Sequence, residues 1–178
     1  MQFQKCFKTT ILLCIFFLDK QDLKSEDDNI AAVIFPGGFG AAKNLCTFAV
    51  ASDPEVDEEV KRVLLEFHGA GKPIGMCCIS PIIAAMVFKD NPAKEPVKLT
   101  LGRREIIDGE SGNWPYATTI DKAEEFGANM VECGVDEVCI DEANKIVTTP
   151  AFMYEGEFHE VYDGINKMVN TLFGMAES

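Results

Sequence analysis

The sequence predicts an α/β domain with a mostly parallel sheet and helices on both faces. Its 178 residues are 47% hydrophobic, which suits one domain with one substantial core. The apolar, β-branched run Ala31–Phe35 ends at Pro36-Gly37-Gly38, as a buried parallel strand ends at a loop. A helix, a second strand and a second helix follow in turn, and this alternation is typical of a parallel sheet covered by helices.

The chain opens with a short apolar run, Ile11–Leu18, which follows Lys5 and Lys8. The run is far shorter than the roughly 20 residues that span a bilayer. No small-x-small cleavage site follows it. Residues 19–30 are mostly polar and acidic, and this composition indicates a solvent-exposed connection. A buried strand, or a sequence foreign to the domain, is therefore favoured over a secretory or membrane signal.

Apolar residues spaced three or four apart predict the first helix. They are Val56, Val60, Val63, Leu64 and Phe67. Lys72–Cys77 is the second predicted strand, and a short turn leads from it into the apolar helix Ile82–Phe88. Ser80 is the expected N-cap of this helix and Pro81 its first residue.

The second half of the chain holds weaker patterns and one strong helix. The weaker ones predict strands at Val97–Leu101, Glu137–Asp141 and Lys145–Thr149 and a helix at Thr119–Phe126. Residues 108–113 are expected to form a surface loop, and Trp114 after it is either a pocket cap or a surface aromatic. The strong helix carries one apolar stripe that is predicted to cover the sheet. The stripe consists of Phe158, Val161, Tyr162, Ile165, Met168, Val169, Leu172 and Phe173.

Composition narrows the classes of function. Sixteen Lys and Arg stand against 29 Asp and Glu, a net charge of −13, so nucleic acid and anionic membrane surfaces are not expected partners. Seven cysteines, an odd number spread along the chain, indicate free thiols in a reducing compartment. We expect no metal and no cofactor, since there is no C-x-x-C pair and the two histidines lie far apart.

Two strand ends could together form a reactive site. Cys78 lies in the turn before a helix, where the unpaired N–H groups and the helix dipole favour the thiolate. The same strand-turn-helix geometry occurs in nucleophile elbows, where neighbouring N–H groups hold an oxyanion. Here the predicted donors are the N–H groups of Ile79, Gly37 and Gly38. Carboxyl ends of parallel strands are also where open α/β sheets hold ligands.

Simpler interpretations of these residues remain open. A cysteine at the end of a buried strand is more often a packing residue, and Cys77 is expected to point into the packing layer. Pro36-Gly37-Gly38 by itself is more often a tight turn than a binding loop. His68 and His159 are interpreted as solvated or dipole-compensating residues rather than catalytic bases.

Several of these segments resemble a known family. They are Ala31–Leu45 (AAVIFPGGFGAAKNL), the Lys72–Pro81 elbow, Trp114-Pro115-Tyr116 and Lys145–Met153. Together they resemble the ElbB group of the PfpI superfamily, which includes a bacterial glyoxalase-like protein and the mitochondrial ES-one proteins, also called glutamine amidotransferase-like class I domain proteins. The resemblance runs from about residue 29 to the C-terminus, so residues 1–28 are predicted to be a non-family segment and residues 29–178 the domain.

The resemblance implies a fold, a site and a setting. The fold is a flavodoxin-like three-layer sandwich, with the N-terminal strands missing or replaced here, and Ile11–Leu18 is a candidate for the vacant strand position. The elbow cysteine is Cys78, and the oxyanion pocket lies at Gly37, Gly38 and Ile79. The resemblance also implies a homodimer, a mitochondrial location, with a cytoplasmic one as the alternative, and glyoxalase-like activity on small reactive aldehydes.

Three departures from the family pattern lower the expected activity. The family's first strand, with a Gly-rich turn and an acidic partner for the cysteine, has no counterpart, so the sequence resembles a shortened or alternatively begun product. No histidine directly follows Cys78, which argues against a peptidase, and Arg103 stands where close relatives have a histidine. We therefore expect weak or absent turnover; a non-catalytic redox-sensing or partner-binding protein is the alternative, and glutamine amidotransfer ranks last.

Overall fold

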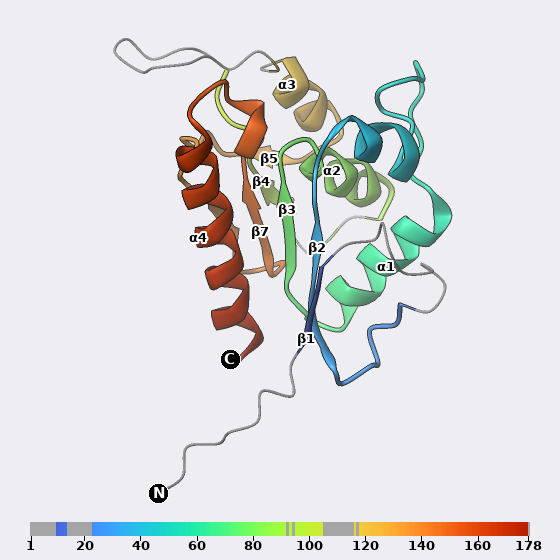
Figure 1. Ribbon diagram of the computed structural model, residues 1–178. Helices are drawn as coiled ribbons and strands as arrows, with labels where there is room; N and C mark the ends of the chain where they lie inside the picture. The colour runs from blue at the N-terminus through green and yellow to red at the C-terminus, as the bar shows by residue number, and fades with distance from the viewer. Residues whose placement is uncertain are drawn as a thin grey trace, which may run out of the picture.

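The computed structural model describes residues 10–13, 23–91, 93, 95–104, 116 and 118–177, of which residues 10–13 are described by their backbone (Figure 1). The strands are β1 (Thr10–Leu13), β2 (Ile30–Phe35), β3 (Ile74–Cys77), β4 (Lys98–Leu99), β5 (Asn129–Met130), β6 (Cys139–Asp141) and β7 (Ile146–Thr149). The helices are α1 (Glu58–Gly69), α2 (Pro81–Asp90), α3 (Thr118–Glu125) and α4 (Phe158–Ala176), with single turns η2 (Ala41–Leu45) and η3 (Ala151–Met153). The predicted loop at residues 108–113 and Trp114 lie outside the described residues.

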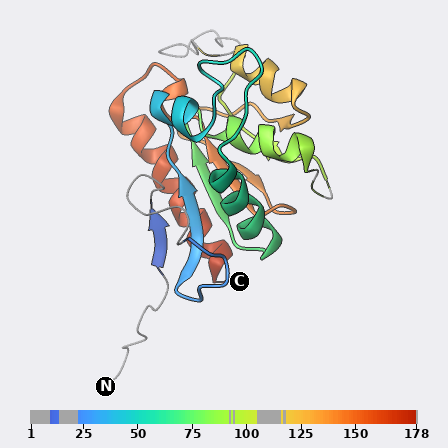
Figure 2. The same ribbon diagram turned by 90° about the vertical axis from the view of Figure 1, so that its right-hand side faces the viewer.

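The main sheet has five strands in the order β1-β2-β3-β7-β6. The pairs β1–β2, β2–β3 and β3–β7 are parallel, and the edge strand β6 runs antiparallel to β7. Helix α4 covers one face, and α1 and α2 cover the other (Figures 1 and 2). The fold is the predicted three-layer α/β sandwich with a mostly parallel sheet.

Some strands differ in length or pairing from those predicted from the sequence. Only Lys98–Leu99 of the predicted strand at residues 97–101 is a strand, and it pairs with β5 in a separate two-stranded sheet. Strand β5 was not predicted, because a strand of two residues is too short to show an alternating pattern. Strand β1 lies within the first 28 residues and forms the sheet edge beside β2. It overlaps the Ile11–Leu18 run, which was a candidate for a vacant strand position.

Helix α1 shows how local signals and packing agree. The Asp57 carboxylate accepts hydrogen bonds from the N–H groups of Glu59 and Val60, both at 3.1 Å, and so caps the first turn. The buried face consists of the predicted residues Val60, Val63, Leu64 and Phe67. Helix α2 is buried from Pro81 to Phe88 because it contacts both α1 and α3 and packs into the same core as β2 and β3, which explains its almost wholly apolar sequence. No helix in the described ranges is both long and apolar enough to span a bilayer.

Helix α4 packs on the sheet through a narrower face than the apolar stripe predicted. Its buried residues are Val161, Gly164, Met168 and Leu172. Phe158, Tyr162 and Phe173 also belong to the predicted stripe, but they are exposed, so this part of the prediction is wrong. The reason is that Gly164 allows the helix to approach the sheet closely along one line, which turns the outer aromatic rings toward solvent.

A network of polar side chains joins β4, β6 and α1. The Asp141 carboxylate accepts from the Lys98 N–H at 2.7 Å and from the Asn144 side-chain amide at 2.8 Å. The Asn144 Oδ1 lies 3.1 Å from His68 Nε2, and the His68 ring packs edge-on against Phe88. His68 lies in the last turn of α1, as the predicted dipole-compensating role requires, and it is half-buried rather than solvated, whereas His159 is exposed as predicted.

Buried thiols make the stability of the fold sensitive to alkaline pH. Burial is the main cause that raises the pKa of Cys139 to about 12, and Cys133 and Asp141 raise it further. A thiol in the unfolded chain has a pKa of about 8.5, so above that pH the unfolded state loses a proton that the native state keeps. The free energy of unfolding should therefore fall as pH rises.

We expect this fall between pH 8 and pH 10 to be about 2 kcal/mol smaller in Cys139→Ala than in the unaltered chain. Urea unfolding of both proteins at the two pH values measures the difference. Equal falls in the two proteins would show that Cys139 does not contribute to the pH dependence.

Candidate functional site around Cys78

Cys78 occupies a strained turn between β3 and α2. Its φ angle is +58°, in the left-handed region that a non-glycine residue rarely adopts. Its N–H donates to the Thr149 carbonyl oxygen at the end of β7, at 3.1 Å, which fixes the turn to the neighbouring strand. The side chain is half-buried. A strained, partly exposed side chain at a sharp strand-to-helix turn is the geometry that the sequence predicted for a nucleophile elbow.

The Ser80 hydroxyl holds this turn together from inside. Its side chain is fully buried, and its oxygen accepts from the Cys77 N–H at 3.0 Å. Its single hydrogen is shared between the carbonyl oxygens of Phe35, at 2.6 Å, and Cys77, at 2.9 Å. Ser80 therefore ties the ends of β2 and β3 to each other. Ser80 occupies the N-cap position of α2 and Pro81 is the first residue of the helix, both as predicted, but the Ser80 side chain makes no capping bond to the helix.

The loop after β2 lies directly against the cysteine. A Cβ added to Gly37 would collide with the Cys78 Cβ and come within 2.7 Å of the Cys77 carbonyl oxygen. Gly38 has open space around it, but its φ of +96° is one that side chains rarely permit. Glycine is therefore needed at the two positions for different reasons: the close approach of Cys78 at Gly37, and the backbone conformation at Gly38. The two strand ends that the sequence analysis brought together do meet in the structure.

The N–H groups around Cys78 are not equivalent. Burial raises the pKa of the Cys77 thiol, and the backbone N–H of Gly37 partly opposes this rise. Cys77 is buried in the packing layer between the sheet and α4, as predicted. Within the described part of the chain, the N–H groups of Gly38 and Ile79 have no acceptor. These two remain available to a ligand at Cys78.

No proton-transfer partner contacts Cys78 in the described ranges. Neither a carboxylate nor an imidazole of these residues bonds to its sulfur. His68 is engaged with Asn144, and His159 lies on the first turn of α4. The same ranges contain no group of three or more His, Cys, Asp or Glu side chains that could hold a metal ion.

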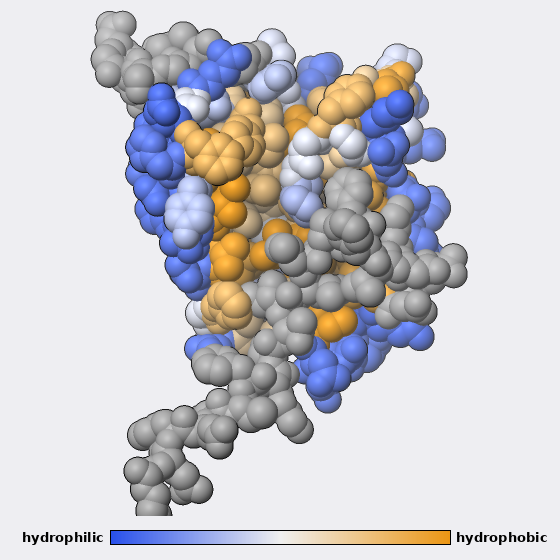
Figure 3. Space-filling view, viewed as in Figure 1, coloured by the Kyte–Doolittle hydropathy of each residue, from blue (hydrophilic) through white to orange (hydrophobic). Residues whose placement is uncertain are grey.

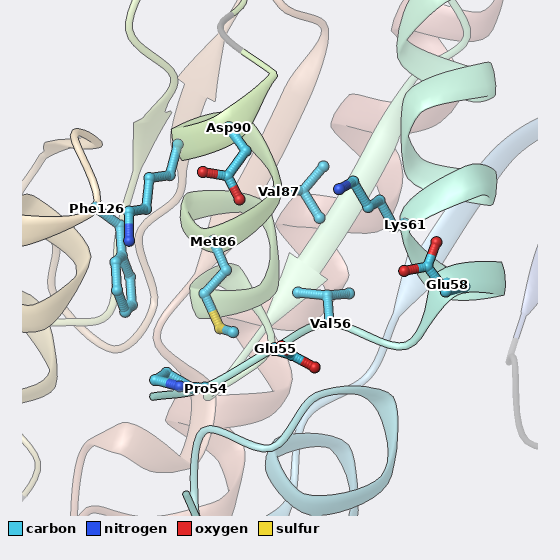
Figure 4. A pocket seen from close by; sticks show the side chains of 10 residues that line it. Pro54, Glu55, Val56, Glu58, Lys61, Met86, Val87, Asp90 and Phe126 are labelled. Atoms are coloured by element: carbon cyan, nitrogen blue, oxygen red, sulfur yellow. The ribbon is translucent and has the colours of Figure 1, made fainter. Parts of the chain in front are cut away.

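Hollows elsewhere on the surface are separate from Cys78. One of about 220 Å³ lies between the start of α1, α2 and Phe126 (Figure 4). It is lined by Pro54, Glu55, Val56, Glu58, Lys61, Met86, Val87, Lys89, Asp90 and Phe126. Another of about 310 Å³ adjoins it and shares Lys89 and Phe126, whose amine and ring are 5.4 Å apart. Neither hollow includes Gly37, Gly38, Cys78 or Ile79, so neither belongs to the candidate site.

The chain is similar to curated mitochondrial proteins. It is 53% identical over 142 residues to "ES1 protein homolog, mitochondrial" of Rattus norvegicus, a match that covers 79% of this chain and 50% of that protein. It is 51% identical, with the same coverage, to "Glutamine amidotransferase-like class 1 domain-containing protein 3, mitochondrial" of Homo sapiens. The match to "ES1 protein, mitochondrial" of Danio rerio is 35% identical and covers 89% of this chain and 56% of that protein.

A solved structure supports the same relationship. It is an isoprenoid biosynthesis protein with an amidotransferase-like domain from Ehrlichia chaffeensis, with a TM-score of 0.70 and 26% identity over 88% of this chain and 63% of that one. No family model matches the chain. The chain spans about half the length of the curated relatives it matches. It is a homologue of the ES1 proteins, the glutamine amidotransferase-like class 1 domain proteins.

Proposed function

We propose that Cys78 is a nucleophile that adds to a small reactive aldehyde such as methylglyoxal, a glyoxalase-like activity in a mitochondrial protein. The observation that supports this most is the turn itself, which holds a half-exposed thiol at φ +58° against Gly37. A strained conformation of a non-glycine residue persists where the surrounding structure imposes it, here through Ser80 and Thr149. The mitochondrial setting rests on the names of the relatives.

The reaction needs no cofactor. The Cys78 thiolate attacks the aldehyde carbon of methylglyoxal, a C–S bond forms, and the carbonyl electron pair moves to the oxygen. The N–H groups of Gly38 and Ile79 would hold that oxyanion until it is protonated to a hemithioacetal. A proton then moves from the former aldehyde carbon to the neighbouring carbon, and the hydroxyl proton passes to the former ketone oxygen, which gives a thioester. Water cleaves the thioester to lactate and the free thiol. The sum is methylglyoxal plus water to lactate and a proton.

The proton shift limits the rate. General acid–base catalysis contributes about 10²–10⁴-fold where a positioned group supplies it. In the described residues no carboxylate or imidazole is bonded to the Cys78 sulfur. We therefore expect formation of the hemithioacetal to be faster than turnover, and the steady-state rate to be low.

Loss of the thiol tests the proposal. In Cys78→Ala, the disappearance of methylglyoxal should fall to the rate measured without protein, because no other described cysteine combines a strained turn with a half-exposed side chain. Lactate formation and residual methylglyoxal are measured together. Cys46→Ala is the matched control, since it removes a buried thiol on the first loop and should leave the rate unchanged. Equal rates in Cys78→Ala and the unaltered chain would contradict the proposal.

No carboxylate or imidazole of the described residues bonds to the Cys78 sulfur, and this favours a second candidate, a redox sensor. The Cys78 thiolate would attack a peroxide oxygen, so that an S–O bond forms, the O–O bond breaks, and hydroxide leaves and is protonated to water. This step needs no base on the protein, and N–H groups at the start of α2 would stabilise the sulfenate. Peroxide titration followed by intact mass should show one added oxygen, lost in Cys78→Ala. An oxygen adduct without aldehyde turnover would favour the sensor over the enzyme.

A further inference from the structure

Three large aromatic side chains gather on the surface where η3 leads into α4. Phe152 is 53% exposed, Phe158 75% and Tyr162 62%. The rings of Phe152 and Phe158 lie 5.9 Å apart, and Phe158 and Tyr162 are one helical turn apart on the same face of α4. We call these three residues the aromatic patch. Figure 3 shows apolar surface running along the inner side of α4, next to a hydrophilic outer edge.

The backbone holds the patch in place despite a cost. Ala151, just before Phe152, is buried and has a φ of +46°, which is unfavourable for a residue with a Cβ. This conformation starts η3, whose other residues place Met153 in the core and Phe152 in solvent. Exposed clusters of large aromatic residues are uncommon on soluble proteins and are typical of interaction sites.

The patch lies within an acidic segment. Residues 151–163 contain Glu155, Glu157, Glu160 and Asp163 and neither Lys nor Arg. Three of these carboxylates are exposed and the fourth, Glu160, is half-exposed. An apolar surface with a negatively charged rim selects a ligand that combines apolar and positive side chains.

We propose that the aromatic patch docks a basic amphipathic helix of another protein. The apolar side of that helix would lie on Phe152, Phe158 and Tyr162, and its Lys and Arg side chains would face the four carboxylates. Charge decides between this occupant and a second copy of the chain. A twofold-symmetric contact through the patch would bring one acidic rim against the other, and like charges at an interface oppose association.

A defined peptide tests the surface. The probe is a short, fluorescently labelled synthetic peptide of Leu and Lys at helical spacing, titrated into the full chain and followed by anisotropy. The double variant Phe158→Ala, Tyr162→Ala should bind about tenfold more weakly than the unaltered chain, because central aromatic residues dominate such interfaces. Both side chains are exposed, so the variant loses little core packing. Phe173→Ala is the matched control, an exposed aromatic at the other end of α4 that should leave affinity unchanged.

Charge is tested separately. Asp163→Asn removes one rim carboxylate without changing the aromatic rings, and it should weaken binding and flatten its dependence on salt. A Leu and Glu peptide of the same pattern should not bind.

Three results would overturn the proposal. The first is equal peptide affinity in the double variant and the unaltered chain, which would reduce the binding to unspecific attraction by the overall charge of −13. The second is equal binding of the acidic peptide. The third is a dimer in sedimentation velocity that the double variant dissociates, because the patch would then belong to a second copy of the chain.

Discussion

Replacing Gly164 with alanine should lower the free energy of unfolding by about 3 kcal/mol. Gly164 lies on the buried face of α4, where the helix crosses the loop after β5 and the end of β7. A Cβ at this position would run into the Val135 carbonyl oxygen and come within 2.9 Å of Thr149 Oγ1. A backbone carbonyl cannot turn aside as a long side chain can, so the whole helix would have to move outward.

Gly174 on the same helix is the matched control. No atom lies within 4 Å of the Cβ that alanine would add there, and its φ is ordinary for a helix. Because alanine loses less conformational entropy in a helix than glycine, Gly174→Ala should raise stability by up to about 1 kcal/mol. Urea unfolding of the two variants should thus give opposite signs. A gain of stability in both variants would show that α4 does not approach the sheet closely at Gly164.

Gly164 also illustrates what periodicity can and cannot predict. The apolar spacing of α4 correctly predicted a helix over Phe158–Phe173 and its place over the sheet. It could not tell Val161 and Met168, which are buried, from Phe158 and Tyr162, which are exposed. The contact line depends on a glycine, and a glycine contributes nothing to an apolar pattern. The outer aromatic rings were therefore assigned to the core.

The parallel strands were predictable for a different reason. Strands buried on both faces are continuous apolar runs, and β2 and β3 show this in the sequence. The pairing of β4 with β5 was not predictable, because each contributes two residues and their contact spans about thirty positions in the chain. The contact between His68 and Asn144 was not predictable for the same reason, since the two residues are distant in sequence and only the fold brings them together.

At the candidate site, the sequence predicted the residues better than their bonds. Cys78 lies in the expected turn with Gly37 against it. The bonding of individual N–H groups depends on details that a motif does not contain, so three N–H groups were predicted as one oxyanion pocket. In the described part of the structure the N–H groups of Gly38 and Ile79 have no acceptor, and the Gly37 N–H lowers the pKa of the Cys77 thiol. Ser80 was predicted as the N-cap because Ser before Pro is typical of a helix start, but the pattern does not show that its hydroxyl bonds to the ends of β2 and β3.

Replacing Ser80 with alanine should have the largest combined effect on the fold and on the site. The substitution removes a fully buried hydroxyl and leaves the Cys77 N–H and the Phe35 carbonyl oxygen without their partner. Each buried polar group left unsatisfied costs about 1–3 kcal/mol, so we expect unfolding to become easier by about 3 kcal/mol. Thr171→Ala, which removes a hydroxyl from the exposed side of α4, should change stability by no more than about 0.5 kcal/mol.

The consequence for Cys78 separates a positioning role of Ser80 from a purely structural one. The Ser80 hydroxyl ties the ends of β2 and β3, so without it the distance between Gly38 and Cys78 is no longer fixed. A displacement of about 1 Å can cost a reaction up to about a hundredfold, and we expect methylglyoxal loss to slow by about tenfold or more in Ser80→Ala under conditions where the variant is folded. Circular dichroism at the assay temperature establishes the folded fraction. Gly69→Ala is the control for the rate, because it adds a Cβ in open space at the end of α1. A folded Ser80→Ala protein with an unchanged rate would show that the hydroxyl stabilises the sheet without positioning the thiol.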